Sequence, residues 1–333
     1  MRSTIFLLLL SSVFLTCPLH AQNAKVNYEK LAKELEVREL STLMFAKYND
    51  ANLRKIDAYL EKHPKAPERE KVLYLRAYSI WSLHRYEEAP PAYAALLKEF
   101  PKTKFSRIAR IREAAAYLFS GQPEQALPRL QTLQKDFPDR PEMYARELAY
   151  ALSRCGKQDE ALAFMNHVET EMLFSKKDQL LPRIKHHFDM VRMIGKPLRD
   201  FKVKDHRSGR EISPETLKGK IVLMDFWATW CRPCLAELPH VKGTHETFSH
   251  AGFEVFGISL DDNRAKLDRM ILDREMDWLH HYDGKKWKNE LAVKFGVHSV
   301  PANLLVDQKG IVRGVNLRGK AVRNMVAKLL DAP

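Results

Sequence analysis

The chain has 333 residues, of which 45% are hydrophobic and 29% charged, and its formal net charge is +13 at pH 7. This length accommodates two domains with separate cores, and the composition excludes a disordered chain. Residues 196–333 carry 24 basic and 18 acidic side chains, so the basic excess is spread over both halves without a dense Lys/Arg run. We interpret it as a solvated basic surface and expect no nucleic-acid partner.

The first 21 residues have the pattern of a signal peptide. Arg2 supplies a positive charge, Ile5–Leu15 is an apolar stretch of signal-peptide length, and Ala21 is a small residue at a cleavage site. We therefore expect an exported, periplasmic protein. Lipidation of Cys17 would instead anchor the chain to a membrane, but the residues before Cys17 fit a bacterial lipobox poorly.

Residues 27–190 have a helical pattern that repeats. Proline-containing pairs recur every 37 residues after apolar runs, at His63-Pro64, Phe100-Pro101 and Phe137-Pro138. Gly121 and Gly156 stand where a turn between paired helices needs a positive φ, and His84 occupies the corresponding place in an earlier unit. The region resembles a short tetratricopeptide-type array, which would bind a protein partner on its concave surface. A helical spacer without a ligand is the alternative.

Strands and helices alternate over the rest of the chain, 194–333. In chain order, the pattern predicts a hairpin at 201–213, a strand at 219–228, a helix at 231–248 bent or interrupted at Pro239, a strand at 252–260 and a helix at 263–275. A short strand at 276–284, a helix at 285–295, a hairpin at 302–317 and a helix at 320–330 follow. We therefore predict a three-layer α/β sandwich at 194–333, preceded by an all-α helical-repeat domain at 27–190.

Two cysteines in the stretch DFWATWCRPC are close together in the sequence. Cys231 and Cys234 follow an apolar strand, whereas Cys155 lies in an apolar helical pattern and is expected to be a buried structural thiol. A bridge across C-x-x-C closes a very short loop and constrains the unfolded chain little. A chemical role therefore explains the pair better than a structural disulfide does. At a junction of strand and helix, unpaired N–H groups and the helix dipole would stabilise a Cys231 thiolate, the attacking species in disulfide exchange.

The motifs of this region, taken together, resemble the thioredoxin superfamily. WCRPC after DFWAT, SVPAN farther along, IGKPLRDF at the start and AELP after the second cysteine are similar to its TlpA/ResA-like exported branch. The resemblance covers about residues 194–331. It implies a thioredoxin-like fold, a redox-active disulfide between Cys231 and Cys234, and no cofactor. Cys231 would attack a substrate disulfide, and Cys234 would resolve the mixed disulfide.

Two carboxylates are candidates to serve Cys234. Asp225 lies within the apolar strand, where burial should raise its pKa. It matches the thioredoxin aspartate implicated in proton transfer to the second cysteine, although many TlpA-like relatives carry asparagine there. Glu237 matches a glutamate of the ResA-like branch that tunes the cysteines. The alternative for Glu237 is a solvated helix residue.

Further residues are expected to shape the substrate surface. Arg232 adds a positive charge beside the first cysteine, Pro233 stiffens the turn, and Trp230 flanks the thiol surface. Pro301 matches the family's cis-proline, which packs opposite the cysteine pair. This bond would place the backbone of Val300 where a substrate peptide can pair with it.

The histidines do not form a recognisable metal site. His240, His245 and His250 recur at intervals of five, so they do not share a helix face. His280 and His281 are neighbours on a predicted strand and should point to opposite sides. We therefore expect no metal.

The hypothesis from the sequence is an exported thiol–disulfide oxidoreductase. It would exchange disulfides with exported proteins through the W-C-R-P-C dithiol. The resemblance favours a reductant that receives electrons from a membrane electron shuttle. Peroxidase chemistry fits less well, because peroxiredoxin-type sites carry a lone Thr-x-x-Cys nucleophile. The alternative is a helical-repeat scaffold or binding protein with a secondary redox domain.

Overall fold

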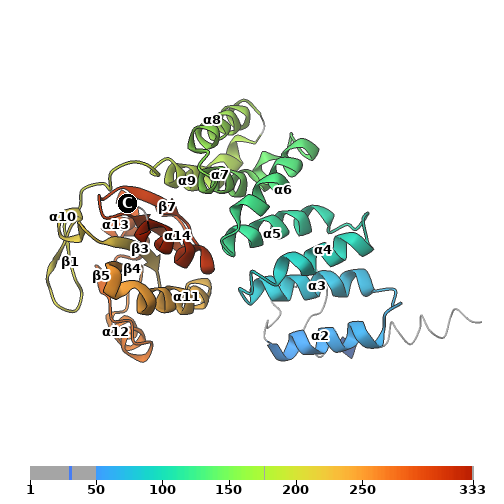
Figure 1. Ribbon diagram of the computed structural model, residues 1–333, viewed down its shortest axis with the longest axis horizontal. Coiled ribbons are helices and arrows are strands. Elements are labelled where there is room, and N and C mark those ends of the chain that lie inside the picture. The colour runs from blue at the N-terminus through green and yellow to red at the C-terminus, as the bar shows by residue number, and fades with distance from the viewer. Residues whose placement is uncertain (1–29, 32–49, 176, 332–333) are drawn as a thin grey trace, which may run out of the picture. The chain divides into compact units, whose positions relative to one another are not determined.

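The computed structural model describes residues 30–31, 50–175 and 177–331 (Figure 1). The expected signal peptide and Cys17 lie outside these described residues. Across the part of the chain that is described, no helix combines the length and apolar character needed to cross a bilayer.

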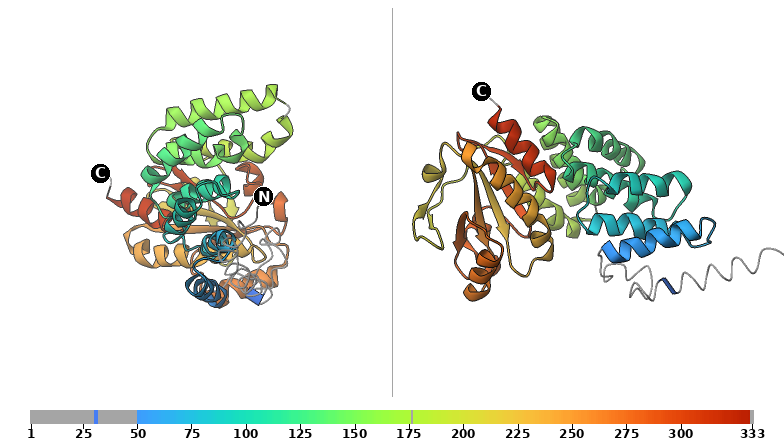
Figure 2. Two further views of the ribbon diagram at one scale, coloured as in Figure 1. Left: turned by 90° about the vertical axis from the view of Figure 1, so that its right-hand side faces the viewer. Right: turned by 60° about the horizontal axis from the view of Figure 1, so that its bottom comes forward.

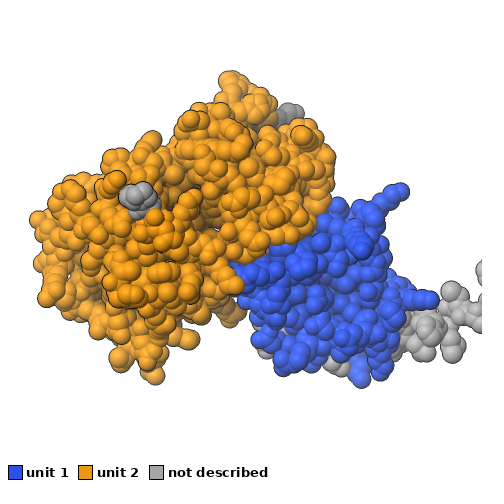
Figure 3. All heavy atoms as spheres, viewed as in Figure 1, with its two compact units in different colours: residues 1–109 blue, residues 110–333 orange. Residues whose placement is uncertain are grey.

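The chain forms two compact units, residues 1–109 and residues 110–333 (Figure 3). The second unit therefore includes helices as well as the whole α/β region. The division into a helical-repeat domain at 27–190 and a domain at 194–333 stays a prediction.

The first unit contains helix pairs joined by tight turns. Its helices are α2 (Asp50–Lys62), α3 (Arg69–Ser82), α4 (Ala89–Glu99) and the start of α5 (Ser106–Phe119). Each helix buries an apolar side, for example Ile56 of α2 and Ile80 of α3. His84, between α3 and α4, has φ of 59°, so it takes the left-handed conformation expected at this turn.

The helices of the second unit continue the same pattern. They are α6 (Pro123–Asp136), α7 (Ala145–Arg154), α8 (Gln158–Phe174) and α9 (Leu181–Val191), with the 3-10 turns η2 (Pro141–Met143) and η3 (Asp178–Leu180) between them. Gly121 and Gly156 have φ of 79° and 76° at the turns after α5 and α7. The expected helix–turn–helix organisation is confirmed in these residues, and the assignment to the tetratricopeptide type stays a prediction.

A five-stranded mixed sheet forms the centre of the α/β region. Its strand order is β5 (Leu279–Tyr282), β4 (Phe253–Ser259), β3 (Ile221–Trp227), β6 (Ala302–Val306) and β7 (Val312–Val315). β3, β4 and β5 are parallel, whereas β6 is antiparallel to β3 and β7 antiparallel to β6. A separate two-stranded ribbon, β1 (Val203–Lys204) and β2 (Glu211–Ile212), precedes the sheet.

Helices cover both faces of this sheet. α11 (Arg232–Phe248) and α14 (Lys320–Leu330) lie side by side on one face (Figure 2). On the other face, Phe295 follows α13 (Glu290–Lys294) and its ring lies 6.2 Å from that of Phe226 in β3. Because successive strand residues alternate between faces, Asp225 points toward the α11 side. The predicted three-layer α/β sandwich is confirmed.

Two predicted helices differ in detail. The expected helix at 285–295 divides into η5 (Lys286–Lys288) and α13, because the buried side chain of Asn289 caps α13 by accepting the N–H groups of Leu291 and Ala292. Of the two alternatives expected at Pro239, a bend or an interruption of the helix, the interruption is wrong and the bend stays a prediction. α11 runs through Pro239, which removes one backbone donor without ending the helix.

A buried amide fixes the segment between β7 and α14. The side chain of Asn303 in β6 donates to the carbonyl of Leu317 at 2.9 Å and accepts the N–H of the same residue at 2.8 Å. The backbone carbonyl of Asn303 also accepts the N–H of Asn316. This clamp holds residues 316 and 317 against the sheet.

Replacing Asn303 by alanine is expected to lower the free energy of unfolding by about 2–5 kcal/mol, because it leaves a buried donor and a buried acceptor unpaired. Urea unfolding followed by circular dichroism measures this. Asn263→Ala removes only the exposed cap of α12 (Arg264–Asp273), so its cost should be about 1 kcal/mol. Equal costs for the two substitutions would contradict the clamp.

Candidate active site

The cysteine pair lies where β3 leads into α11. β3 ends at Trp227, the Cys231 N–H donates to the carbonyl of Ala228 at 3.1 Å, and Cys231 is the N-cap of α11. Its sulfur accepts the N–H of Cys234 at 3.2 Å. Cys231 and Cys234 form a disulfide, and only 5% and 7% of their surfaces are exposed. The predicted strand–helix junction is therefore present.

An aspartate that the sequence analysis did not single out holds this turn. Asp261 follows β4, the strand next to β3, and accepts the N–H and the hydroxyl of Thr229, the latter at 2.6 Å. Ser259 donates a further hydrogen bond to the same carboxylate at 2.9 Å. A buried acid just after a predicted parallel strand was the available signal, because the ends of parallel strands meet at one edge of a sheet.

Asp225 lies in the centre of the sheet with a perturbed carboxyl group. It is paired across the sheet with Gly257 in β4 and Asn303 in β6. Burial raises the pKa of Asp225 to about 7, the positive charge of Arg318 opposes this rise, and the negative charge of Glu237 adds to it. The upward shift of this pKa agrees with the expectation from the sequence, and the carboxyl group can gain or lose a proton near neutral pH.

Glu237 is buried on α11. Only 6% of it is exposed, and one of its carboxylate oxygens accepts the N–H of Gly319 at 2.7 Å. The alternative of a solvated helix residue is therefore wrong. Its carboxylate ties α11 to the start of α14, and its action on the cysteines stays a prediction.

The residues predicted to meet a substrate lie at one edge of the sheet. Trp230 is 49% exposed, with its ring 6.0 Å from that of Trp287, while Arg232 and Pro233 are exposed at the start of α11. The Val300–Pro301 peptide bond is cis.

The cis-proline loop reaches the same edge through the strand order. β6 begins at Ala302, which pairs with Phe226 near the end of β3. The preceding Val300 and Pro301 therefore lie at the end of the sheet from which the chain continues to Cys231.

Arg318 is a second residue that the sequence analysis missed. Its guanidinium donates to the carbonyl of Leu317 at 2.7 Å and also to the carbonyl of Pro301. An arginine in a loop after a hairpin gives no signal in the sequence, because only the fold brings it to Pro301 and Asp225.

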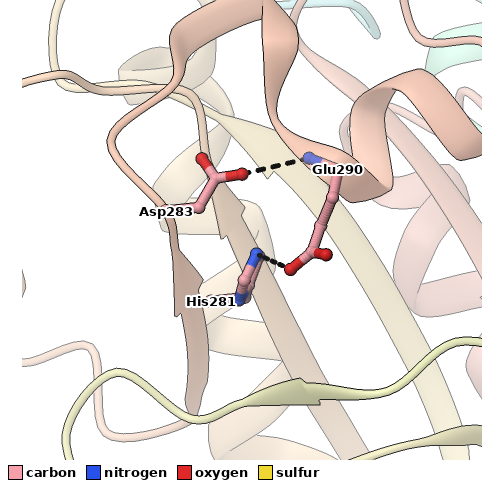
Figure 4. Close-up of side chains that lie close together, drawn as sticks. All are labelled: His281, Asp283 and Glu290. Carbon is pink, nitrogen blue, oxygen red and sulfur yellow. Dashed lines mark hydrogen bonds and ion pairs between the residues drawn. The ribbon is translucent and has the colours of Figure 1, made fainter.

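Three side chains, from β5, the turn after it and the start of α13, have ligand atoms within 4.8 Å of one another (Figure 4): His281, Asp283 and Glu290. The Nε2 atom of His281 lies 3.5 Å from Glu290. Both carboxylate oxygens of Asp283 accept backbone N–H groups, from Lys285 and from Glu290, each at 3.0 Å. The hydrogen bonds hold Asp283 against the start of α13, and burial lowers the pKa of His281, which favours the neutral ring beside Glu290. The cluster does not by itself indicate a metal site.

Comparisons with known proteins concern this α/β region. Residues 194–315 match the AhpC/TSA family. The thiol-disulfide oxidoreductase ResA of Bacillus thuringiensis subsp. konkukian (strain 97-27) is 28% identical over 119 residues, which are 36% of this chain and 66% of that protein. The thiol:disulfide interchange protein DsbE of Pseudomonas fluorescens biotype C is 31% identical over 123 residues, 37% of this chain and 65% of that protein.

The α/β region has a thioredoxin-like fold. A similar solved structure is the thioredoxin domain of a thiol-disulfide oxidoreductase from Bacteroides vulgatus, with 27% identity and a TM-score of 0.39, covering 41% of this chain and 98% of that one. The chain spans less than two thirds of the length of the two sequence relatives, 66% and 65%. The helices before residue 194 lie outside the family match.

Asp225→Asn in the thioredoxin-like domain is expected to change stability in a pH-dependent way. Because the pKa of Asp225 is raised from 3.8 to about 7 on folding, its contribution is fully present below pH 3.8 and is lost as the pH rises through 7. The variant should therefore gain up to about 4 kcal/mol relative to wild type at pH 8 and little at pH 4. Urea unfolding of the oxidised protein at both pH values measures this.

Asp307→Asn is the matched control with the opposite sign. Burial raises the pKa of Asp307, but bonds from the Ile311 N–H and from Arg313 outweigh it and leave that pKa below its usual value. This variant should lose stability at pH 8. A gain that is the same for Asp225→Asn at pH 4 and pH 8 would contradict the raised pKa.

Proposed function

We propose that the protein is a thiol–disulfide oxidoreductase that acts on protein substrates through Cys231 and Cys234. One observation carries the proposal: the sulfur of Cys231 caps α11 and accepts the N–H of Cys234 at 3.2 Å. The same backbone group and the helix dipole would stabilise a Cys231 thiolate in the reduced protein. The printed names of the relatives ResA and DsbE, a thiol-disulfide oxidoreductase and a thiol:disulfide interchange protein, support the same reaction.

The reaction begins with the reduced dithiol. The Cys231 thiolate attacks one sulfur of a substrate disulfide, a mixed disulfide forms, and the other substrate sulfur leaves as a thiolate. Cys234 then loses its proton and attacks the sulfur of Cys231. This forms the Cys231–Cys234 disulfide and releases the second substrate thiolate. Two electrons pass from the protein to the substrate.

Asp225 is proposed as the proton acceptor for Cys234. A carboxyl group with a pKa of about 7 is present partly as the carboxylate at neutral pH, so it can take a proton from a thiol. Glu237 would act on this group through its charge, because it raises the pKa of Asp225.

The exposed edge of the site is proposed to receive the substrate chain. Trp230, Arg232 and Pro233 border the disulfide at the start of α11. The backbone of Val300 lies before the cis-proline Pro301, where an extended peptide could pair with it.

We also propose export to the periplasm and a reducing role. The signal-peptide pattern of residues 1–21 supports export. Exported protein disulfides would be the substrates, and a membrane electron shuttle would return the disulfide to the dithiol. The match to the AhpC/TSA family does not make a peroxidase the better proposal, because the nucleophile has a partner three residues on rather than standing alone.

Helical scaffolding is the second candidate. Repeated helix–turn–helix units in both compact halves favour a protein-binding role for the region at 27–190. In the full-length protein, replacement of both Cys231 and Cys234 by serine separates the candidates. Loss of biological activity supports the redox role, whereas full activity would make scaffolding the main function.

Cys231→Ser in the full chain is expected to reduce insulin-disulfide reduction by more than about 100-fold, because the attacking thiolate is gone. Cys234→Ser should instead accumulate a mixed disulfide, detectable by non-reducing electrophoresis. Cys155→Ser is the matched control and should leave the rate unchanged. Undiminished reduction by Cys231→Ser would refute the proposed function.

The reduction potential of the dithiol tests the reducing role separately. Equilibration with glutathione buffers should give a value closer to the roughly −270 mV of thioredoxin than to the roughly −120 mV of a strong oxidant. A potential near the oxidising end would overturn the reducing role and leave the exchange reaction intact.

A further inference from the structure

Arg318 connects three parts of the thioredoxin-like domain. It follows β7, and its guanidinium donates to the carbonyls of Leu317 and Pro301. It therefore reaches from the segment before α14 to the cis-proline loop. A guanidinium can hold two carbonyls at once because its donors point in fixed directions within one plane.

The charge of Arg318 also acts on Asp225, the half-buried acid of β3. Asp225 feels the positive charge of Arg318 and the negative charge of Glu237, with opposite effects on its pKa. On the other side, Tyr150 and Arg154 of α7 and His187 of α9 feel the charge of Arg318. Burial lowers the pKa of His187 to about 2, so this histidine is neutral and adds no positive charge near Arg318.

The position of Arg318 is set by bonds on both sides of its segment. Arg154 donates to the carbonyls of Val315 and Asn316, the latter at 2.9 Å. The side chain of Asn316 donates to the hydroxyl of Tyr150 at 2.6 Å, while the amide of Asn303 holds Leu317. The segment before Arg318 is thus fixed by α7 on one side and by β6 on the other.

We propose that Arg318 is a positioning residue of the dithiol site, which holds the cis-proline loop through the carbonyl of Pro301 and places a positive charge against the Asp225 carboxylate. The inference rests on the proposed function and deepens it. Arg318 keeps Asp225 ionised to lower pH, so that the carboxylate is available to take the proton of Cys234. Without this charge, burial and Glu237 alone would act on Asp225 and the acid would stay protonated at neutral pH.

The test compares Arg318→Gln with Arg318→Lys in the full-length protein. NMR titration of the Asp225 carboxyl carbon in the oxidised protein should give a pKa about one unit higher in Arg318→Gln than in wild type, as expected when a neighbouring positive charge is lost. Arg318→Lys keeps the charge and should stay within about half a unit of wild type. This measurement needs no activity, so it separates failure of this inference from failure of the proposed function.

A kinetic measurement checks the same role in the reaction. In stopped-flow experiments, the pH midpoint of the resolving step should move up by about one unit in Arg318→Gln, as the pKa of Asp225 does. Asp225→Asn should slow this step most below pH 7, where few Cys234 thiols ionise unaided. In an Asp225→Asn background, Arg318→Gln should then leave the midpoint unchanged.

Each outcome is decisive. An unchanged pKa of Asp225 in Arg318→Gln overturns the inference, and so does an equal rise in Arg318→Gln and Arg318→Lys, because the charge would then not be the cause. If Arg318→Gln does not fold, Arg318→Met removes the same charge with a side chain of similar length and should give the same rise in the pKa of Asp225. An unchanged pKa in Arg318→Met would overturn the inference.

Discussion

One backbone N–H group, that of Cys234, sets what the cysteine pair can do. It points at the sulfur of Cys231 because that residue caps α11, and it can do so only if β3 ends and α11 begins within a few residues. The carboxylate of Asp261 fixes this short connection by binding Thr229. The sheet therefore matters to the cysteine pair because it holds the N-terminal end of α11 against the sulfur of Cys231.

A second constraint follows from the acid in the centre of the sheet. An ionised carboxylate at Asp225 is costly because its neighbours in the strand are apolar and buried. A positive charge at Arg318 and a negative charge at Glu237 adjust that cost in opposite directions. The raised pKa of Asp225 lowers the stability of the fold above neutral pH and leaves a carboxyl group that can change its protonation state near neutral pH.

Much of the thioredoxin-like domain could be predicted from the sequence, because its signals are local. The apolar run before Cys231 predicted β3, and the spacing of the two cysteines predicted their place at a helix start. The continuous passage of α11 through Pro239 and the break at Asn289 could not be predicted, since tertiary packing and a side-chain cap decide them. Residues that act on the site only through tertiary contacts were not predicted, for the same reason. Arg318 lies far along the chain from the cysteines, and no local pattern points from it to the site, whereas the position of Asp261 just after a strand was a signal that could have been used.

The hydrogen bonds from α7 to the segment before Arg318 bear on whether the α/β region can be separated from the helices before it. Arg154 of α7 donates hydrogen bonds to the backbone carbonyls of residues 315 and 316. The hydroxyl of Tyr150, also in α7, accepts a hydrogen bond from the side-chain amide of Asn316. A chimera that transplanted only the match at 194–315 would cut through this segment and leave Arg318 behind. The smallest portable unit that keeps the proposed site intact therefore includes α7 as well as the α/β region.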